Sequence, residues 1–265
     1  MPTRFWFPAS EAAAVSPAFT AGWDNTGQAV RRRLAHVKGT SALTGGTIIQ
    51  WSGSGQTDAL DRQYVSDEMA AGVVFQSGVT TCKCYLMARQ FAGSDEVEQR
   101  PLSIRVFSSD GSTVRATVWA KNLYASINEL TTTYTNRSWA NGDTATGSYT
   151  TVDGDRLVVE IGYEEDAFSG TSDAQALWGE LGTDIPENES NTTQNPGWIE
   201  FSNTITMAAD VAGQPTMRRW GGVPGMPPGG IKIGRSWCRG KSIKGKQLWL
   251  PETRVLFPEK MLLTG

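Results

Sequence analysis

Apolar and polar residues alternate with a period of two along much of this chain, and this pattern most limits how it folds. The alternation is clearest in LSIRVFSSDGSTVRATVWA, residues 102–120. Apolar side chains occupy every second position of 102–106 and again of 114–118, and the residues between them, 109–112, have the composition of a turn. The segment therefore predicts a β-hairpin with one buried face.

Further strands are expected from the same period, whereas the 3.6-residue period of a helix is scarce. They lie at 46–51, 79–91, 156–163 and 198–207, with shorter candidates near 4–7, 62–66 and 130–135. Residues 164–197 read as one long polar connection. These features predict an all-β chain, folded as an antiparallel β-sandwich of jelly-roll-like form.

The chain changes character near residue 206. Residues 1–205 carry 14 Lys+Arg against 24 Asp+Glu, while 206–265 carry 10 against 3. The last sixty residues are also interrupted by Gly and Pro, which prevent long helices and central strands. We therefore expect an N-terminal segment at 1–45, packed on or part of the body, a β-sandwich body at 46–207, and an extended basic arm at 208–265.

The arm combines basic, apolar and aromatic residues. A basic strip with tryptophans could bind single-stranded nucleic acid, but the interleaved Pro, Leu and Val favour a protein groove, including the acidic body of a neighbouring copy. Protein partners and a homo-oligomer are the preferred interpretation. The residues expected at such an interface are Trp220, Trp237, Trp249, Arg235, Arg239, Lys244, Leu256 and Phe257.

No arrangement typical of catalysis or of a cofactor stands out. His36 is the single histidine, and neither a Gly-x-Ser-x-Gly elbow nor a phosphate-binding loop is present. Carboxylates at 153, 155, 160 and 164–166 could serve glycoside hydrolysis or calcium binding, but acidic loops on an acidic body are usually solvated surface, and this is the preferred interpretation. We predict a non-enzyme without catalytic, cofactor or metal residues, and no run approaches the roughly 20 apolar residues of a membrane span.

Cys82 and Cys84 stand two apart in an expected strand, so both side chains point to the same face. We interpret them as small buried apolar residues, with a metal half-site as the remaining alternative. The odd total of three cysteines excludes a full set of intrachain disulfides.

Several segments resemble poorly characterised structural proteins of tailed bacteriophages, which are β-rich, jelly-roll-like virion components. These segments are residues 62–66, 104–120, 135–143 (TNRSWANGD), 153–163 (DGDRLVVEIGY) and 184–205. The resemblance spans about residues 60–205 and excludes the arm. It implies a non-enzymatic virion protein, assembled in the host cytoplasm, that serves in capsid decoration, the neck or the tail.

Two other functions remain open at this point. Jelly rolls often bind glycans on exposed aromatic platforms, and Trp119, Trp139 and Trp178 are the candidates for stacking on sugar rings. A glycan-binding or receptor-binding module is therefore the alternative to a structural role. The third hypothesis is a polysaccharide-degrading enzyme.

Overall fold

The computed structural model describes residues 1–54, 57–92, 97–125, 129–165 and 169–212, together with four short stretches at 232–233, 236–237, 239–243 and 246–250. The chain forms two compact units, Met1–Gln214 and Pro215–Gly265. The first unit is all-β apart from one short helix, α1 (Ala208–Ala212), as the alternation predicts.

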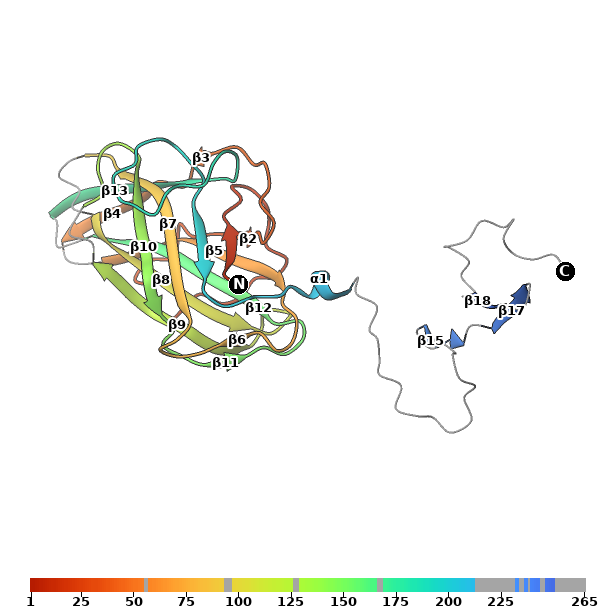
Figure 1. The fold of residues 1–265 in the computed structure, drawn as a ribbon. Helices are drawn as coiled ribbons and strands as arrows, with labels where there is room; N and C mark the ends of the chain where they lie inside the picture. Colours follow the sequence, from red (N-terminus) through yellow and green to blue (C-terminus); the bar gives the residue numbers. More distant parts are fainter. Residues whose placement is uncertain are drawn as a thin grey trace. The chain divides into compact units, whose positions relative to one another are not determined.

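The larger sheet of the first unit has seven strands, arranged around β7 (Thr81–Gln90) (Figure 1). One edge of β7 pairs with β10 (Thr135–Thr144). Along its other edge β14 (Trp198–Phe201) and β13 (Ser169–Trp178) follow one another. The remaining strands extend this sheet outward: β1 (Thr3–Trp6), β3 (Thr44–Gly45) and β4 (Ile49–Ser54).

The smaller sheet has five strands in the order β2-β5-β12-β8-β9. Their bounds are Val30–Leu34, Thr57–Glu68, Arg156–Glu165, Val97–Phe107 and Val114–Ala125. β8 and β9 form the expected hairpin, longer than its sequence pattern at both ends. β2 runs parallel to β5, so the expectation of a purely antiparallel fold is wrong at this pair. A small two-stranded sheet joins β6 (Val74–Phe75) to β11 (Tyr149–Thr150).

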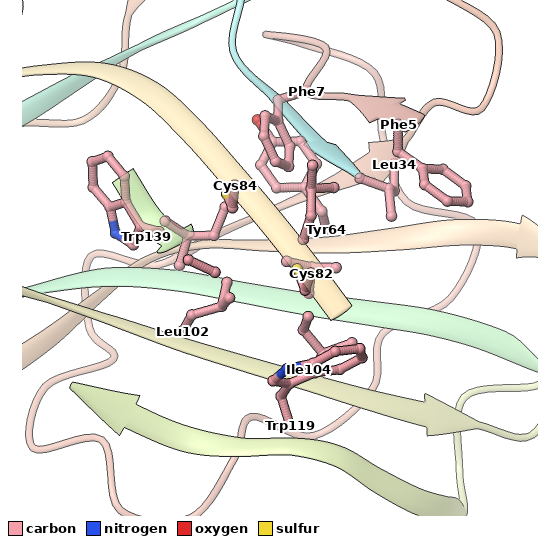
Figure 2. Close-up of a cluster of buried hydrophobic side chains, with 14 of the residues drawn as sticks. Phe5, Phe7, Leu34, Tyr64, Cys82, Cys84, Leu102, Ile104, Trp119 and Trp139 are labelled. Carbon is pink, nitrogen blue, oxygen red and sulfur yellow. The ribbon is translucent and has the colours of Figure 1, made fainter. Parts of the chain in front are cut away.

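The two larger sheets share one hydrophobic core. Cys82, Cys84 and Trp139 reach it from the seven-stranded sheet, and Leu102 and Ile104 reach it from the five-stranded sheet (Figure 2). Both cysteines are free and fully buried, which confirms their interpretation as small apolar core residues. Alternate residues of β12 enter this core because a strand presents successive side chains to opposite faces.

The expected strands at 4–7, 46–51, 62–66, 79–91 and 156–163 correspond to β1, β4, β5, β7 and β12. The strand expected at 198–207 is shorter, because the chain bends after Phe201. The candidate at 130–135 is wrong for all but its last residue. Thr131 donates from its hydroxyl to the carbonyl of Thr133, and this local bond favours a turn, after which β10 begins at Thr135.

Several strands lie where the sequence pattern predicts none, among them β2, β13 and most of β10. β13 occupies the middle of the expected polar connection at 164–197, paired on both sides. β2 contains three consecutive arginines, Arg31, Arg32 and Arg33. Arg33 forms ion pairs with Glu11 and Asp67, whereas Arg31 and Arg32 donate to neutral oxygens of Gln63, Pro17 and Ala9.

The second unit contains two short antiparallel pairs in its described stretches. β15 (Lys232–Ile233) pairs with β16 (Ser236–Trp237), and β17 (Arg239–Ile243) pairs with β18 (Lys246–Leu250).

Candidate functional site

The three tryptophans expected to stack on sugars are buried in the first unit. Trp119, Trp139 and Trp178 are 1%, 0% and 0% exposed. The indole of Trp139 donates to the carbonyl of Gly162 across the core, and Trp178 meets Phe7 edge to face. A sugar platform needs an exposed ring face, so the assignment of these three residues to a glycan site is wrong.

The residues expected at an arm interface cannot be placed as side chains. Trp220, Arg235, Lys244, Leu256 and Phe257 lie outside the described residues. The backbones of three others belong to the strand pairs of the second unit: Trp237 in β16, Arg239 in β17 and Trp249 in β18. The interface therefore stays a prediction.

Asp61 is a carboxyl group whose pKa is strongly perturbed. It is fully buried in the five-stranded sheet, where the register of β5 against β12 shifts by one residue and leaves Asp61 as a bulge. Tyr163 donates its hydroxyl to Oδ2 of Asp61 over 3.1 Å. Burial raises the pKa of Asp61 to about 7, although the charge of Arg62 and the Tyr163 and Trp178 donors oppose the rise.

A carboxyl with a pKa near neutrality is suited to general acid–base chemistry, but only where a substrate can reach it. Asp61, Tyr163 and Trp178 are all 0% exposed, and Arg62 is 5% exposed. These groups face the interior of the fold, so a molecule in solvent cannot reach Asp61.

A second buried carboxylate, Glu160, fastens the N-terminal segment to the face of the five-stranded sheet that lies away from the shared core. Glu160 is 0% exposed and accepts a hydrogen bond from Arg105 at 2.7 Å and one from Gln63 at 2.8 Å. The backbone N–H of Thr20 and the indole of Trp23 complete the set at 3.0 Å and 2.9 Å. Because both of its carboxylate oxygens accept hydrogen bonds from the protein, Glu160 has a structural role.

The other acidic candidates also serve the fold where they are described. Asp155 is buried and accepts from the hydroxyl of Tyr149 and the N–H of Val152. Glu165 accepts from Ser172 over 2.6 Å across β12 and β13. Asp153 is exposed in the preceding turn. No group of three or more His, Cys, Asp or Glu residues is placed to hold a metal ion in the described part of the chain.

His36 lies between two carboxylates at the end of the first unit. Its Nδ1 is 3.5 Å from Asp67 at the end of β5, and its Nε2 is 3.8 Å from Asp210 on α1. Among the described residues, neither of these contacts involves a serine or cysteine that could act as a nucleophile. The contacts connect the sheet to the helix from which the chain leaves the first unit.

A loop clamp on β10 is the feature that sequence reasoning missed. Residues 186–191 lie against the strand: the side-chain amide of Asn136 donates to the carbonyls of Pro186 and Asn188. Glu189 accepts from the guanidinium of Arg100 and from the N–H of Ser138, both at 2.9 Å. The clamp joins two of the segments that carry the phage resemblance, 135–143 and 184–205.

No helix of the described residues is long and apolar enough to span a membrane.

Comparison with known proteins adds little. No family model matches the chain, and no curated protein matches it. Among solved structures, one of infectious bursal disease virus, Gx strain, shows 13% identity and a TM-score of 0.21 over 66% of this chain and 39% of that chain. A CocE/NonD family hydrolase from Staphylococcus aureus shows 10% identity and a TM-score of 0.18 over 65% of this chain and 33% of its own. This chain thus spans about two fifths and one third of those chains, and neither likeness carries an argument about function.

Proposed function

We propose that this chain is a non-enzymatic structural protein of a tailed-bacteriophage virion, serving in capsid decoration, the neck or the tail. In this proposal the first unit is a jelly-roll-like sandwich. The residues after Gln214 form a basic arm that lies against other virion proteins and against copies of the same chain.

The opposite charge of the two compact units carries this proposal. Residues 215–265 hold 10 Lys+Arg against 2 Asp+Glu, whereas residues 1–214 hold 14 against 25. Such opposition favours contact between the second unit of one copy and the first unit of another, because complementary potentials steer and orient association. Repeated copies with one such contact form closed rings or extended arrays.

Three carboxylates of the first unit that fasten loops agree with a scaffold. Glu160, Asp155 and Glu189 each hold a loop or an N-terminal segment in place. Surfaces formed by loops that are fixed in this way change little on binding, which suits repeated assembly contacts.

The virion role is tested on purified particles. We expect the chain in particles at a fixed copy number, measured by quantitative mass spectrometry; its absence would overturn the virion assignment. Particles made with a chain truncated after Gln214 should lose the protein or assemble abnormally. Normal incorporation of the truncated chain would overturn the role of the arm.

The charge argument is tested by matched neutralisations in the full-length chain. Arg239→Gln with Lys241→Gln should weaken self-association in sedimentation velocity at low salt, and added salt should weaken the unaltered protein similarly. Lys83→Gln with Arg115→Gln removes the same charge from the first unit, where both side chains are among the more exposed cations at 37% and 43%. Equal effects from the two pairs would contradict a specific role for the arm.

A further inference from the structure

A bulge in β10 holds Asn141 and Gly142, the single Asn-Gly pair of the sequence. Asn141 lies opposite Lys83 on β7, and the next paired residue of β10 is Asp143. Gly142 is therefore the extra residue of the bulge, and it adopts a φ of 85°, which glycine tolerates because it has no Cβ. Asn141 is exposed to solvent. The pair combines an accessible side-chain amide with a following peptide nitrogen that no side chain shields.

The side-chain carbonyl of Asn141 has a fixed hydrogen-bond donor. Tyr85 on β7 donates its hydroxyl to Oδ1 of Asn141 over 2.9 Å. Tyr85 is 2% exposed, and its ring centroid lies 5.4 Å from that of Trp198, so packing holds the hydroxyl in position. A donor fixed at a carbonyl oxygen stabilises the negative charge that develops there when a nucleophile adds to the carbonyl carbon. The hydrogen bond from Tyr85 therefore favours attack at Cγ of Asn141.

We propose that Asn141 is a self-modification site, at which the backbone nitrogen of Gly142 displaces the side-chain amide as ammonia. The backbone nitrogen loses its proton and forms a bond to Cγ of Asn141. The bond from Cγ to Nδ2 breaks, and the departing nitrogen takes up a proton. The product is a five-membered succinimide ring. Water then opens this ring at either carbonyl, which leaves aspartate or isoaspartate at position 141.

Two other asparagines of the first unit lack this combination. Asn188 is exposed as well, but Glu189 follows it, and a side chain on the following residue hinders the approach of the peptide nitrogen. Asn136 is 0% exposed, and its amide nitrogen donates to two backbone carbonyls. These two residues therefore separate the effect of the following glycine from the effect of burial.

The modification would change the charge of the outer face of the seven-stranded sheet. A new carboxylate at position 141 lies across from Lys83, whose ammonium pairs with Glu187 of the loop clamp at 2.7 Å. Residues directly opposite each other on antiparallel strands interact, so the new charge would compete with Glu187 for this ammonium.

The test is prolonged incubation of the intact chain in mildly alkaline buffer, followed by digestion at acid pH and mass spectrometry of the peptides. We expect the converted fraction at position 141 to rise with time while positions 136 and 188 stay unchanged. Isoaspartate should accompany aspartate, as measured by labelling with an isoaspartyl methyltransferase, because a succinimide opens both ways. Absence of conversion at 141, or conversion to aspartate alone, overturns the proposal.

Two variants test the chemistry at the site, and urea unfolding verifies that each one folds. Tyr85→Phe keeps the ring beside Trp198 and removes the hydroxyl, so conversion should slow; an unchanged rate overturns the role of Tyr85. Gly142→Ala shields the peptide nitrogen with a methyl group that meets nothing within 4 Å. Conversion should then be lost, and conversion at the native rate overturns attack by this nitrogen.

Discussion

Arg105 on β8 donates from Nη2 to Oε1 of Glu160 on the neighbouring strand β12 over 2.7 Å, and the two residues are 6% and 0% exposed. The same Nη2 donates to the carbonyl of Ala18 over 2.6 Å. One buried ion pair therefore fixes both the sheet and the segment that covers it. Burial lowers the pKa of Arg105, and the adjacent Glu160 opposes that change.

Glu160→Gln should destabilise the first unit strongly. The change leaves the Arg105 guanidinium buried without its counter-ion, and breaking a buried pair in this way costs about 3–5 kcal/mol of unfolding free energy. Urea unfolding gives the magnitude, and hydrogen exchange at the Thr20 amide should accelerate because its acceptor is weakened. Glu187→Gln is the control, because its pair with Lys83 is about 40% exposed and contributes less than about 1 kcal/mol. Equal losses in the two variants would contradict the assigned role of Glu160.

Asp61 should make the stability of the first unit depend on pH. Burial raises its pKa to about 7 in the folded chain, from an ordinary value of 3.8 in the unfolded chain. Because the folded state holds the proton more tightly, the stabilisation is fully present below pH about 4 and is lost as pH rises to about 7.

Comparison with Asp61→Asn isolates this dependence. The difference in unfolding free energy, native minus variant, should fall by about 4 kcal/mol as pH rises from about 4 to about 7. Above about pH 7 this difference should stay constant. Urea titrations at several pH values on both proteins provide the measurement. A difference that is independent of pH, or that grows as pH rises, would contradict the assignment.

The period-two pattern located only some of the strands whose alternate residues enter the core. It missed β13, SGTSDAQALW, although Ala174, Ala176 and Trp178 enter the core, because small and polar residues fill the rest of this strand, which is held by pairing with β4 and β7. β2 was missed because its Arg33 finds partners in Glu11 and Asp67, and only the fold brings these together. The local sequence pattern does not show which strands pair, because the pairing depends on contacts between residues far apart in the chain.

The candidate site shows the same limit. Local sequence places Trp139 in a polar surrounding, yet the acceptor of its indole is the carbonyl of Gly162 on another strand. The local sequence does not distinguish a buried tryptophan from an exposed one, because the distant acceptor of the indole N–H is unknown at that stage. The bulge that turns Asp61 inward likewise depends on the register of β5 against β12.

Gly162→Ala should be poorly tolerated. A Cβ at this position would lie 2.2 Å from the carbonyl oxygen of Ala59 and 2.5 Å from the ring of Trp23. Overpacking of this kind costs about 1–3 kcal/mol, measured by urea unfolding, and Trp23 fluorescence should shift as its ring is displaced. Gly27→Ala is the control, since its nearest neighbour is 3.4 Å away. If both variants unfold at the same urea concentration, the close packing of Trp23 on β12 is wrong.

Asn136→Ala should release the loop clamp while leaving the sheets folded. The amide of Asn136 holds the carbonyls of Pro186 and Asn188, so its removal frees both to bond with water and lets residues 186–191 leave β10. A glutamate-specific protease should then cut faster after Glu187 and Glu189, as read by mass spectrometry of the fragments. Asn203→Ala, which removes a similar amide bond to Val74 in another loop, should leave those two cleavage rates unchanged. Cleavage at 187 and 189 that is as slow in Asn136→Ala as in the native chain would show that the clamp does not depend on this side chain.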